Sequence, residues 1–188
     1  MPTETDVRSS VQQIVEEAHA LGNLAAMVER IKDQLSRAIG LGTIALAERF
    51  HRTKMDTYAR RLLVKDDALG YTAVAMTWGP GQRTGVHDHA GMWCVEGVVE
   101  GEMDVYQFDL ERTEAGLFEF TAKGRIHAGV GAAGCLIPPY EYHVLANALE
   151  RPSITLHIYG GEMTECNVFV PRADGWYERQ TRRLSYDD

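Results

Sequence analysis

The chain of 188 residues carries a formal net charge of −8, with 45% hydrophobic and 24% charged residues. These values are typical of a soluble globular protein with one hydrophobic core, so we expect a single domain over residues 1–188. The acidic residues are spread along the chain, which disfavours nucleic acid as a partner. No apolar run approaches the roughly 18 residues of a membrane span, so no membrane partner is expected either.

The cysteines and the N-terminal segment bear on the cellular compartment. Cys94, Cys135 and Cys166 are odd in number and widely spaced, which argues against a disulfide framework and for a reducing environment. The first ten residues, MPTETDVRSS, contain no apolar stretch of the kind found in secretory signals. We therefore expect a cytoplasmic protein.

The N-terminal quarter predicts helices. From residue 6 to 21, apolar side chains recur at helical spacing, with Asp6 as the expected N-cap and Gly22 as the stop. The same spacing over 24–39 predicts a second amphipathic helix. A shorter third helix is expected at about 43–50.

Beyond residue 57 the chain consists of short segments rich in β-branched and aromatic residues and separated by glycine: YTAVAMTW, WCVEGVVEG, EMDVYQF, LFEFTA and SITLHIYG. They predict an antiparallel β body over about 58–170, followed by a C-terminal tail to residue 188. The helical part, about 6–50, should pack on one end of it, because neither part can bury its apolar face alone. We expect a mainly β, α+β fold.

Three histidines are candidate metal ligands. His87 and His89 are two residues apart in GQRTGVHDH, and on a strand such residues point to the same face, where they can chelate one ion. His143 lies in PPYEYHVLAN, a turn followed by a predicted strand, from which a third imidazole could reach the same ion. A lone pair of histidines at this spacing is more often structural, so the interpretation depends on its context.

These segments resemble the two motifs of the cupin superfamily. Four residues match the first, G-x5-HxH-x4-E-x6-G: Gly81, His87, His89 and Gly101. Three match the second, P-x-G-x2-H-x3-N: Pro138, His143 and Asn147. Cys94 stands where the first motif has its glutamate, and Tyr140 where the second has glycine. The resemblance implies a cupin-type antiparallel β-barrel or jelly roll.

The missing glutamate changes the chemistry expected of a metal in this site. Three neutral imidazoles leave the charge of the ion uncompensated, whereas the familiar non-haem iron site has two histidines and a carboxylate. Three open positions would accept a thiolate, a second substrate donor and O2, and the charge favours thiolate over thiol. One alternative stays open: a register shift would make Glu96 a fourth ligand.

Within the cupins, residues 58–159 most resemble the cysteine dioxygenase family. Its members hold one ferrous iron per chain through three histidines, and a cysteine and a tyrosine beside the iron can form a thioether. Cys94 and Tyr159 occupy these positions. The family's Ser-x-His-x-Tyr segment is similar to TLHIY, so the resemblance implies that His157 orients the tyrosine hydroxyl and that Thr155 preserves the hydrogen-bond relay.

Tyr58-Ala59-Arg60 is similar to the Tyr-x-Arg segment of the same family, whose guanidinium binds the substrate carboxylate. The planar fork of an arginine suits this role, because it pairs with a carboxylate through two charge-assisted hydrogen bonds. In the related 3-mercaptopropionate dioxygenases this position is usually glutamine, and the crosslinking cysteine is usually glycine. Arg60 and Cys94 therefore both favour L-cysteine as the substrate.

The resemblance thus implies an iron(II)-dependent dioxygenase of cysteine catabolism, a monomer or weak homo-oligomer that converts L-cysteine and O2 to cysteine sulfinic acid. Its metal ligands would be His87, His89 and His143. Three alternatives stay open: the same chemistry on 3-mercaptopropionate or another mercapto-acid, a zinc or manganese cupin enzyme, and a non-catalytic cupin that binds a small molecule.

Several other residues are expected to be structural. His127 lies in the glycine-rich segment GRIHAG, which predicts a surface loop, and Arg61 is expected to be a solvated surface charge. Trp78 and Trp93 flank the first motif and are expected to pack in the core.

Overall fold

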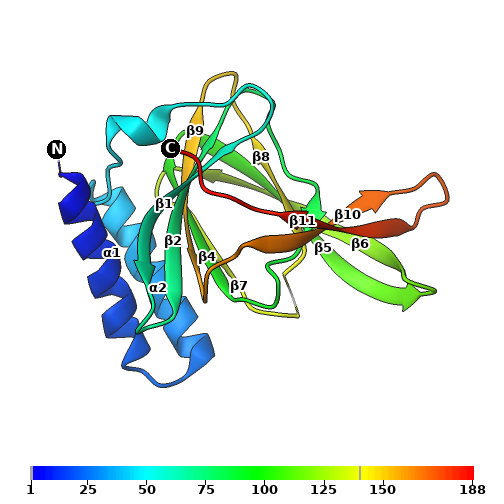
Figure 1. The fold of residues 1–188 in the computed structure, drawn as a ribbon, viewed down its shortest axis with the longest axis horizontal. Helices are drawn as coiled ribbons and strands as arrows, with labels where there is room; N and C mark the ends of the chain where they lie inside the picture. The colour runs from blue at the N-terminus through cyan, green and yellow to red at the C-terminus, as the bar shows by residue number, and fades with distance from the viewer. Residues whose placement is uncertain (1, 140) are drawn as a thin grey trace.

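The computed structural model describes residues 2–139 and 141–188. Two helices, α1 (Glu4–His19) and α2 (Leu24–Gly40), lie side by side against one end of a β structure (Figure 1). Both predicted helices are confirmed to within two residues at each end. Across these described ranges, no helix combines the length and apolar character needed to cross a membrane.

The start of α1 and the segment after α2 differ from the prediction. Thr3, not Asp6, is the N-cap: its hydroxyl accepts from the Asp6 amide, and the Asp6 carboxylate accepts from the Thr3 amide. This capping box satisfies two amides that a helix start leaves free. The third predicted helix is only a 3-10 turn, η1 (Glu48–His51), because a segment of about eight residues forms too few hydrogen bonds to nucleate an α-helix.

The β part forms two antiparallel sheets. One has the strand order β1-β2-β9-β4-β7, and the other closes in the order β10-β11-β6-β5-β8-β3. The mainly β, α+β fold with helices at one end is therefore confirmed. The strands are β1 (Ala59–Asp66), β2 (Tyr71–Trp78), β3 (Val86–His87), β4 (Cys94–Glu100), β5 (Glu102–Glu114), β6 (Leu117–Gly129), β7 (Ala133–Leu136), β8 (His143–Asn147), β9 (Ser153–Tyr159), β10 (Glu165–Pro171) and β11 (Tyr177–Arg183).

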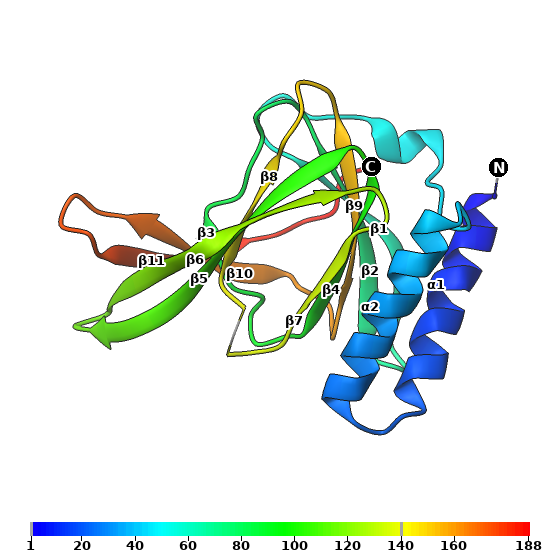
Figure 2. The same cartoon turned by 180° about the vertical axis from the view of Figure 1, so that it is seen from behind.

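Helix α2 packs closely on β4 and β7, as seen from behind in Figure 2. Gly97 permits this approach, because a Cβ atom there would lie 2.8 Å from Cδ1 of Ile39. On the same strand, Val95 and Val99 belong to the core shared with the helices. Because side chains alternate along a strand, Glu96 and Val98 point into the barrel instead.

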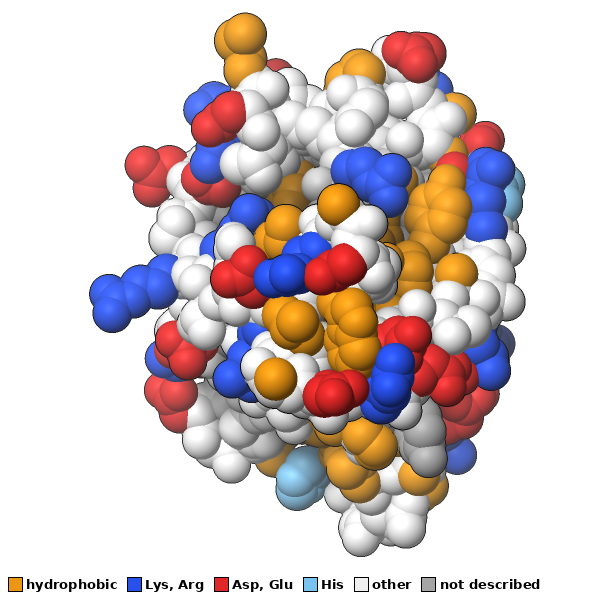
Figure 3. All heavy atoms as spheres, turned by 90° about the vertical axis from the view of Figure 1, so that its right-hand side faces the viewer, with side chains coloured by type: hydrophobic (Ala, Val, Ile, Leu, Met, Phe, Trp, Pro, Cys, Tyr) orange, Lys and Arg blue, Asp and Glu red, His pale blue; other side chains and the backbone are white. Residues whose placement is uncertain are grey.

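The hairpins β5–β6 and β10–β11 extend away from the helices, on the right of Figure 1. A small aromatic core lies beneath them, and Figure 3 shows hydrophobic side chains gathered among charged ones at this end. Phe169 is at its centre and 2% exposed, with the ring of Phe118 4.9 Å away and that of Phe120 5.0 Å away, centroid to centroid.

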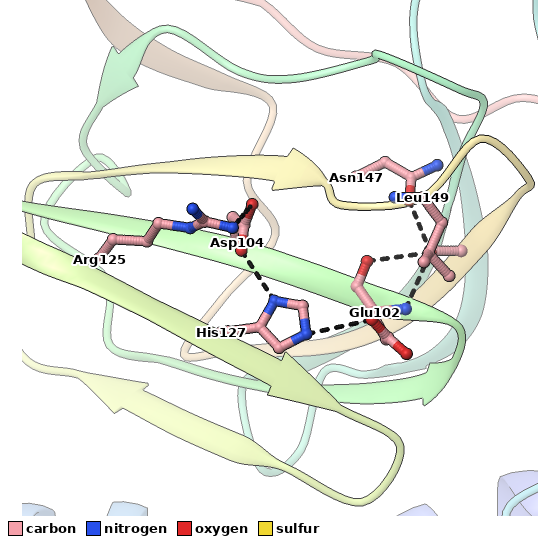
Figure 4. Close-up of polar contacts among 7 residues, drawn as sticks. Glu102, Asp104, Arg125, His127, Asn147 and Leu149 are labelled. Atoms are coloured by element: carbon pink, nitrogen blue, oxygen red, sulfur yellow. Dashed lines mark hydrogen bonds and ion pairs between the residues drawn. The ribbon is translucent and has the colours of Figure 1, made fainter.

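His127 lies on β6 rather than in the predicted loop. Its predicted place on the surface is correct, since its side chain is 52% exposed. Its ring lies between Asp104, 3.0 Å from Nδ1, and Glu102, 3.1 Å from Nε2 (Figure 4). The prediction of a loop was wrong because Gly124 is paired with Gln107, where a register shift between β5 and β6 absorbs the irregularity without ending the strand.

Candidate metal centre

The three candidate ligands converge inside the barrel. His87 on β3 lies opposite His143 on β8 in the antiparallel pair, and His89 reaches them from the turn that follows β3. One ring nitrogen from each histidine lies within 4.8 Å of the others. A single ion with metal–nitrogen bonds of about 2 Å would bring three such nitrogens within about 4 Å of one another, so this spacing suits one bound metal.

Neighbouring groups orient the imidazoles. The carbonyl of Gly85 lies 3.1 Å from Nδ1 of His87, which leaves Nε2 to face the cluster. Glu141 accepts a hydrogen bond from the backbone amide of His89, and its carboxylate lies 3.6 Å from Nδ1 of that ring. Sequence reasoning missed Glu141, although its place two residues before His143 was a usable signal. Such outer contacts typically fix the ring orientation of metal-binding histidines.

Burial favours the neutral form of two of the three candidate ligands. Burial lowers the pKa of His87 to about 3 and that of His143 well below its usual range, and the neighbouring imidazoles act in the same direction. Neither ring nitrogen of His143 has a hydrogen-bond partner among the described residues. A buried imidazole that is neither charged nor hydrogen-bonded is poorly stabilised by the protein alone, so the donor set fits a metal ion.

A second group lies on the pair β4 and β9. The register places Cys94 opposite Tyr159, Glu96 opposite His157, and Val98 opposite Thr155. The ring of Tyr159 is 5.9 Å from that of His89, centroid to centroid. The sheet thus brings together residues that are more than fifty positions apart in the chain and aligns them beside the histidine cluster.

His157 is held between Thr155 and Glu96. The Thr155 hydroxyl lies 2.8 Å from Nε2 of His157, within hydrogen-bond distance. Nδ1 has no hydrogen-bond partner in the described part of the chain and lies 3.5 Å from the Glu96 carboxylate. The rings of His157 and Tyr159 stack with an interplanar angle of 17°. The contact to Tyr159 is therefore ring stacking, and the second ring nitrogen faces Glu96.

Glu96 and Tyr159 have strongly perturbed acidities. Burial raises the pKa of Glu96 to about 8. Burial also raises the pKa of Tyr159 well above its usual range, and Cys94 adds to this effect. Glu96 Oε2 is 4.0 Å from Nε2 of His143. However, Glu96 does not share a cluster with the three histidines: its ligand atom groups with those of Cys94 and His157, all within 4.8 Å of one another.

Arg60 faces the barrel interior from β1 and is only 5% exposed. Its Nη1 donates to the carbonyl of Ser185, 3.2 Å away, and its Nη2 to that of Met163, 3.4 Å away. Nε has no partner within the described residues. Of the five N–H groups of a guanidinium, most are therefore free to bind an anion. Nearby, Tyr58 stacks on Trp78 with ring centroids 4.4 Å apart.

Arg61 points away from the site, and the expectation of a solvated charge was wrong. It is 3% exposed and donates to the backbone carbonyls of Arg52 and Asp188. Alternation along β1 turns it toward the opposite side of the sheet from Arg60, where burial lowers its pKa. Tyr140, the departure from the second motif, lies outside the described residues.

A cavity of about 160 Å³ reaches this site from the side of β5, β6 and β7. Glu96, His143 and Thr155 are among the residues that line it. Apolar side chains form much of its wall, including Val98, Met103, Val105 and Leu145. Sequence patterns did not indicate this cavity, because it lies between strands from distant parts of the chain.

The chain is similar to several solved structures. Among solved structures, the chain is similar to a Thermus thermophilus protein, with 20% identity over 62% of this chain and 94% of that one and a TM-score of 0.47. A Klebsiella pneumoniae protein with a double-stranded β-helix domain is 17% identical over 64% and 91%, with a TM-score of 0.49. A Desulfitobacterium hafniense cupin superfamily protein is 13% identical over 59% and 84%, with a TM-score of 0.43.

The family described as cysteine dioxygenase type I matches residues 10–172. This range includes α2, all three histidines of the cluster, and every strand that carries a residue of the site. The fold is accordingly a cupin-type β-barrel with N-terminal helices, and the chain belongs to the cysteine dioxygenase type I family.

Proposed function

We propose that this protein is an iron-dependent thiol dioxygenase that oxidises L-cysteine with O2 to cysteine sulfinic acid. The observation that carries the proposal is the convergence of one ring nitrogen each from His87, His89 and His143 within 4.8 Å, in the barrel that also buries Arg60 and Tyr159. Family membership supports dioxygenase chemistry. The substrate and the metal are inferred from the chemistry of these side chains.

The donor set fits one ferrous ion per chain. His87, His89 and His143 would hold it, since uncharged imidazoles suit iron and the nitrogens of His143 lack any other partner in the described chain. When bound, the ion supplies positions at which a thiolate and O2 meet, whose direct reaction is spin-forbidden and slow. Side chains of the barrel would bind and orient the substrate and would donate hydrogen bonds to it.

Arg60 would bind the substrate carboxylate. Its guanidinium is buried and is held by two backbone carbonyls, which leave most of its N–H groups free among the described residues. Tyr58, stacked on Trp78, would form the neighbouring wall of the carboxylate site. A thiol anchored in this way has little freedom to turn, which lowers the entropy cost of reaching the reactive geometry.

Tyr159 would donate a hydrogen bond to the substrate or to O2. Because burial raises the pKa of Tyr159, its hydroxyl keeps the proton at neutral pH. Its position directly opposite Cys94 also supports the thioether, in which Sγ bonds to the tyrosine ring, each partner loses one hydrogen, and O2 serves as the oxidant. Mass spectrometry of the linked peptides tests for the thioether directly.

The proposal is tested by assaying the purified, iron-loaded protein in an oxygen electrode. We expect cysteine-dependent O2 uptake with stoichiometric formation of sulfinate. A protein that retains iron and oxidises only 3-mercaptopropionate or another mercapto-acid would correct the substrate. A folded protein that retains no iron would contradict the proposal and favour a zinc or manganese enzyme or a small-molecule-binding barrel, which metal analysis then separates.

A further inference from the structure

Strands β6 and β7 follow each other in the chain but lie in different sheets. β7 is the last strand of the sheet that begins with β1, whereas β6 pairs with β5 and β11 in the other sheet. No backbone ladder joins β6 to β7 among the described residues, and Figure 2 shows them diverging from the turn at 130–132. The cavity of about 160 Å³ lies between them, because residues of both strands line it: Ile126, Ala128, Gly134 and Leu136.

This cavity extends from the surface to the candidate metal centre. Ile126 is 51% exposed, whereas two other residues that line the cavity, His143 and Thr155, are 0% and 3% exposed. Arg60 and Tyr159 are not among the lining residues. Since β1, which carries Arg60, and β7 are the opposite edges of one sheet, the cavity reaches His143 from a different side than the proposed carboxylate site.

The buried part of the cavity wall is mainly apolar. Val98, Met103 and Leu145 line it and are each at most 5% exposed. The polar side chains along the cavity are those of Glu96, Gln107, His127, His143 and Thr155. A charged amino acid would lose its hydration along such a wall at a high cost in free energy, whereas apolar cavities of about 150 Å³ bind small apolar molecules such as xenon. The wall therefore suits a small uncharged molecule.

We propose that O2 reaches the candidate metal centre through this cavity, while the thiol substrate is held from the side of Arg60. The inference rests on the proposed thiol dioxygenase function, which consumes O2, and adds the path that O2 takes. Because O2 is apolar, its transfer from water into an apolar cavity is favourable. A path that avoids Arg60 also lets O2 enter while the thiol occupies its own site.

Gly134 is the position at which this path can be blocked. It lines the cavity and stands opposite Glu96 in the β4–β7 pair, so a side chain there would share the interior face with Glu96. A Cβ atom at Gly134 would have no heavy atom within 4 Å apart from those of its chain neighbours, so an aromatic ring has room to extend into the cavity. Gly129 has the same free space, but it stands opposite Glu102 and does not line the cavity. It is therefore the matched control position.

The test measures the steady-state kinetics of the iron-loaded protein, with O2 and L-cysteine varied separately. Gly134→Phe should lower kcat/KM for O2 several-fold and leave KM for L-cysteine unchanged, because the ring fills the cavity and not the side of Arg60. Gly134→Ala and Gly129→Phe should match wild type. An unchanged kcat/KM for O2 in Gly134→Phe, or a rise in KM for L-cysteine alone, would overturn the proposal, since the cavity would then be unused or would carry the thiol.

Xenon binding gives a readout that depends neither on turnover nor on iron. In crystals of the wild-type protein pressurised with xenon, we expect a xenon atom in the cavity beside Val98 and Met103. Gly134→Phe should exclude it, and Gly129→Phe should retain it. A wild-type cavity without xenon would contradict the proposal even if Gly134→Phe failed to fold. If the iron-loaded wild type consumed no O2 with any thiol, the proposed function would fail and the path with it, whereas normal O2 capture by Gly134→Phe would overturn the path alone.

Discussion

His143 is 0% exposed, and it shows how the site depends on single residues. Val144 and Leu145, which follow it on β8, are also buried, so this part of the strand lies away from water. Neither ring nitrogen of His143 has a hydrogen-bond partner among the described residues. A bound metal ion would therefore stabilise this neutral ring.

We therefore expect His143→Ala to lose most of its iron. Loss of a residue that only hydrogen-bonds to a metal ligand typically lowers metal affinity by roughly 10- to 100-fold. Removing one of the three ligands themselves should lower the affinity by at least as much. Elemental analysis after gel filtration measures the iron bound per chain. His127→Ala is the control, because that histidine pairs with Asp104 on the surface. Full retention of iron by His143→Ala would remove it from the ligand set.

At the scale of elements, the segment after β11 packs against β1 and positions Arg60. Asp187 accepts from the backbone amide of Arg60 at 2.9 Å and donates its own amide to the Arg60 carbonyl. Lys54 pairs with the same carboxylate at 2.7 Å. Together with the Ser185 carbonyl on Nη1 of Arg60, these contacts hold the guanidinium at a defined place in the barrel.

Asp187→Ala should raise KM for L-cysteine several-fold and change kcat little. The substitution removes a contact that positions Arg60 and leaves the three histidines unchanged. Substrate affinity should therefore fall more than the rate of the chemical step. Steady-state kinetics at saturating O2 separates the two parameters. Asp174→Ala, in the exposed turn between β10 and β11, should behave as wild type. An equal fall in kcat would show that the tail acts on more than the carboxylate contact.

Another contact between elements gives a pH dependence. The guanidinium of Arg49, in η1, lies against Glu4 at the start of α1 and, together with that of Arg8, lowers the pKa of Glu4 from 4.5 to about 2. Because the folded pKa is depressed, the stabilisation is present above pH 4.5 and is lost as the pH falls toward 2.

Glu4→Gln should reduce the free energy of unfolding by about 1 kcal/mol at pH 7, since the partly exposed pair is screened by solvent. The difference from wild type should shrink as the pH falls below 4.5. Urea titrations at pH 7 and pH 3 measure both values. Glu16→Gln, at an exposed position of the same helix, is the control. A difference that does not depend on pH would contradict the assigned ion pair.

At the scale of the whole molecule, one buried cluster joins the helices to the sheet. Val11 of α1, Leu35 of α2, Val95 of β4 and Leu156 of β9 all belong to it, and each is 0% exposed. Removing either part would expose this surface to water. We therefore propose that helices and barrel form a single cooperative domain.

Helical and barrel signals should disappear together on heating. Far-ultraviolet circular dichroism at about 222 nm follows mainly α1 and α2, and tryptophan fluorescence includes Trp78, which is fully buried in the barrel. Coincident transitions, with equal van't Hoff and calorimetric enthalpies, are expected of one unit. Two separated midpoints would show that the helices unfold independently of the barrel.

Local patterns in the sequence were sufficient for the elements and for much of the candidate site. Helical spacing located α1 and α2, and β-branched segments located strands such as β2 and β9. Both signals are local, since they follow from side-chain geometry within one element. The two histidine motifs and the Tyr-x-Arg segment indicated the family in the same way, because each is a short segment that is recognised by the spacing of its residues.

Tertiary structure alone decided what surrounds these residues. Glu96 faces His157 because β4 pairs with β9 in a particular register across more than fifty residues, and Glu141 meets the amide of His89 across a similar separation. The tail reaches Arg60 from 125 residues away. Register and long-range packing depend on the sum of many contacts, so no local pattern specifies them. The sequence by itself therefore identified the three histidines, while only the fold showed the buried carboxyl group of Glu96 beside them.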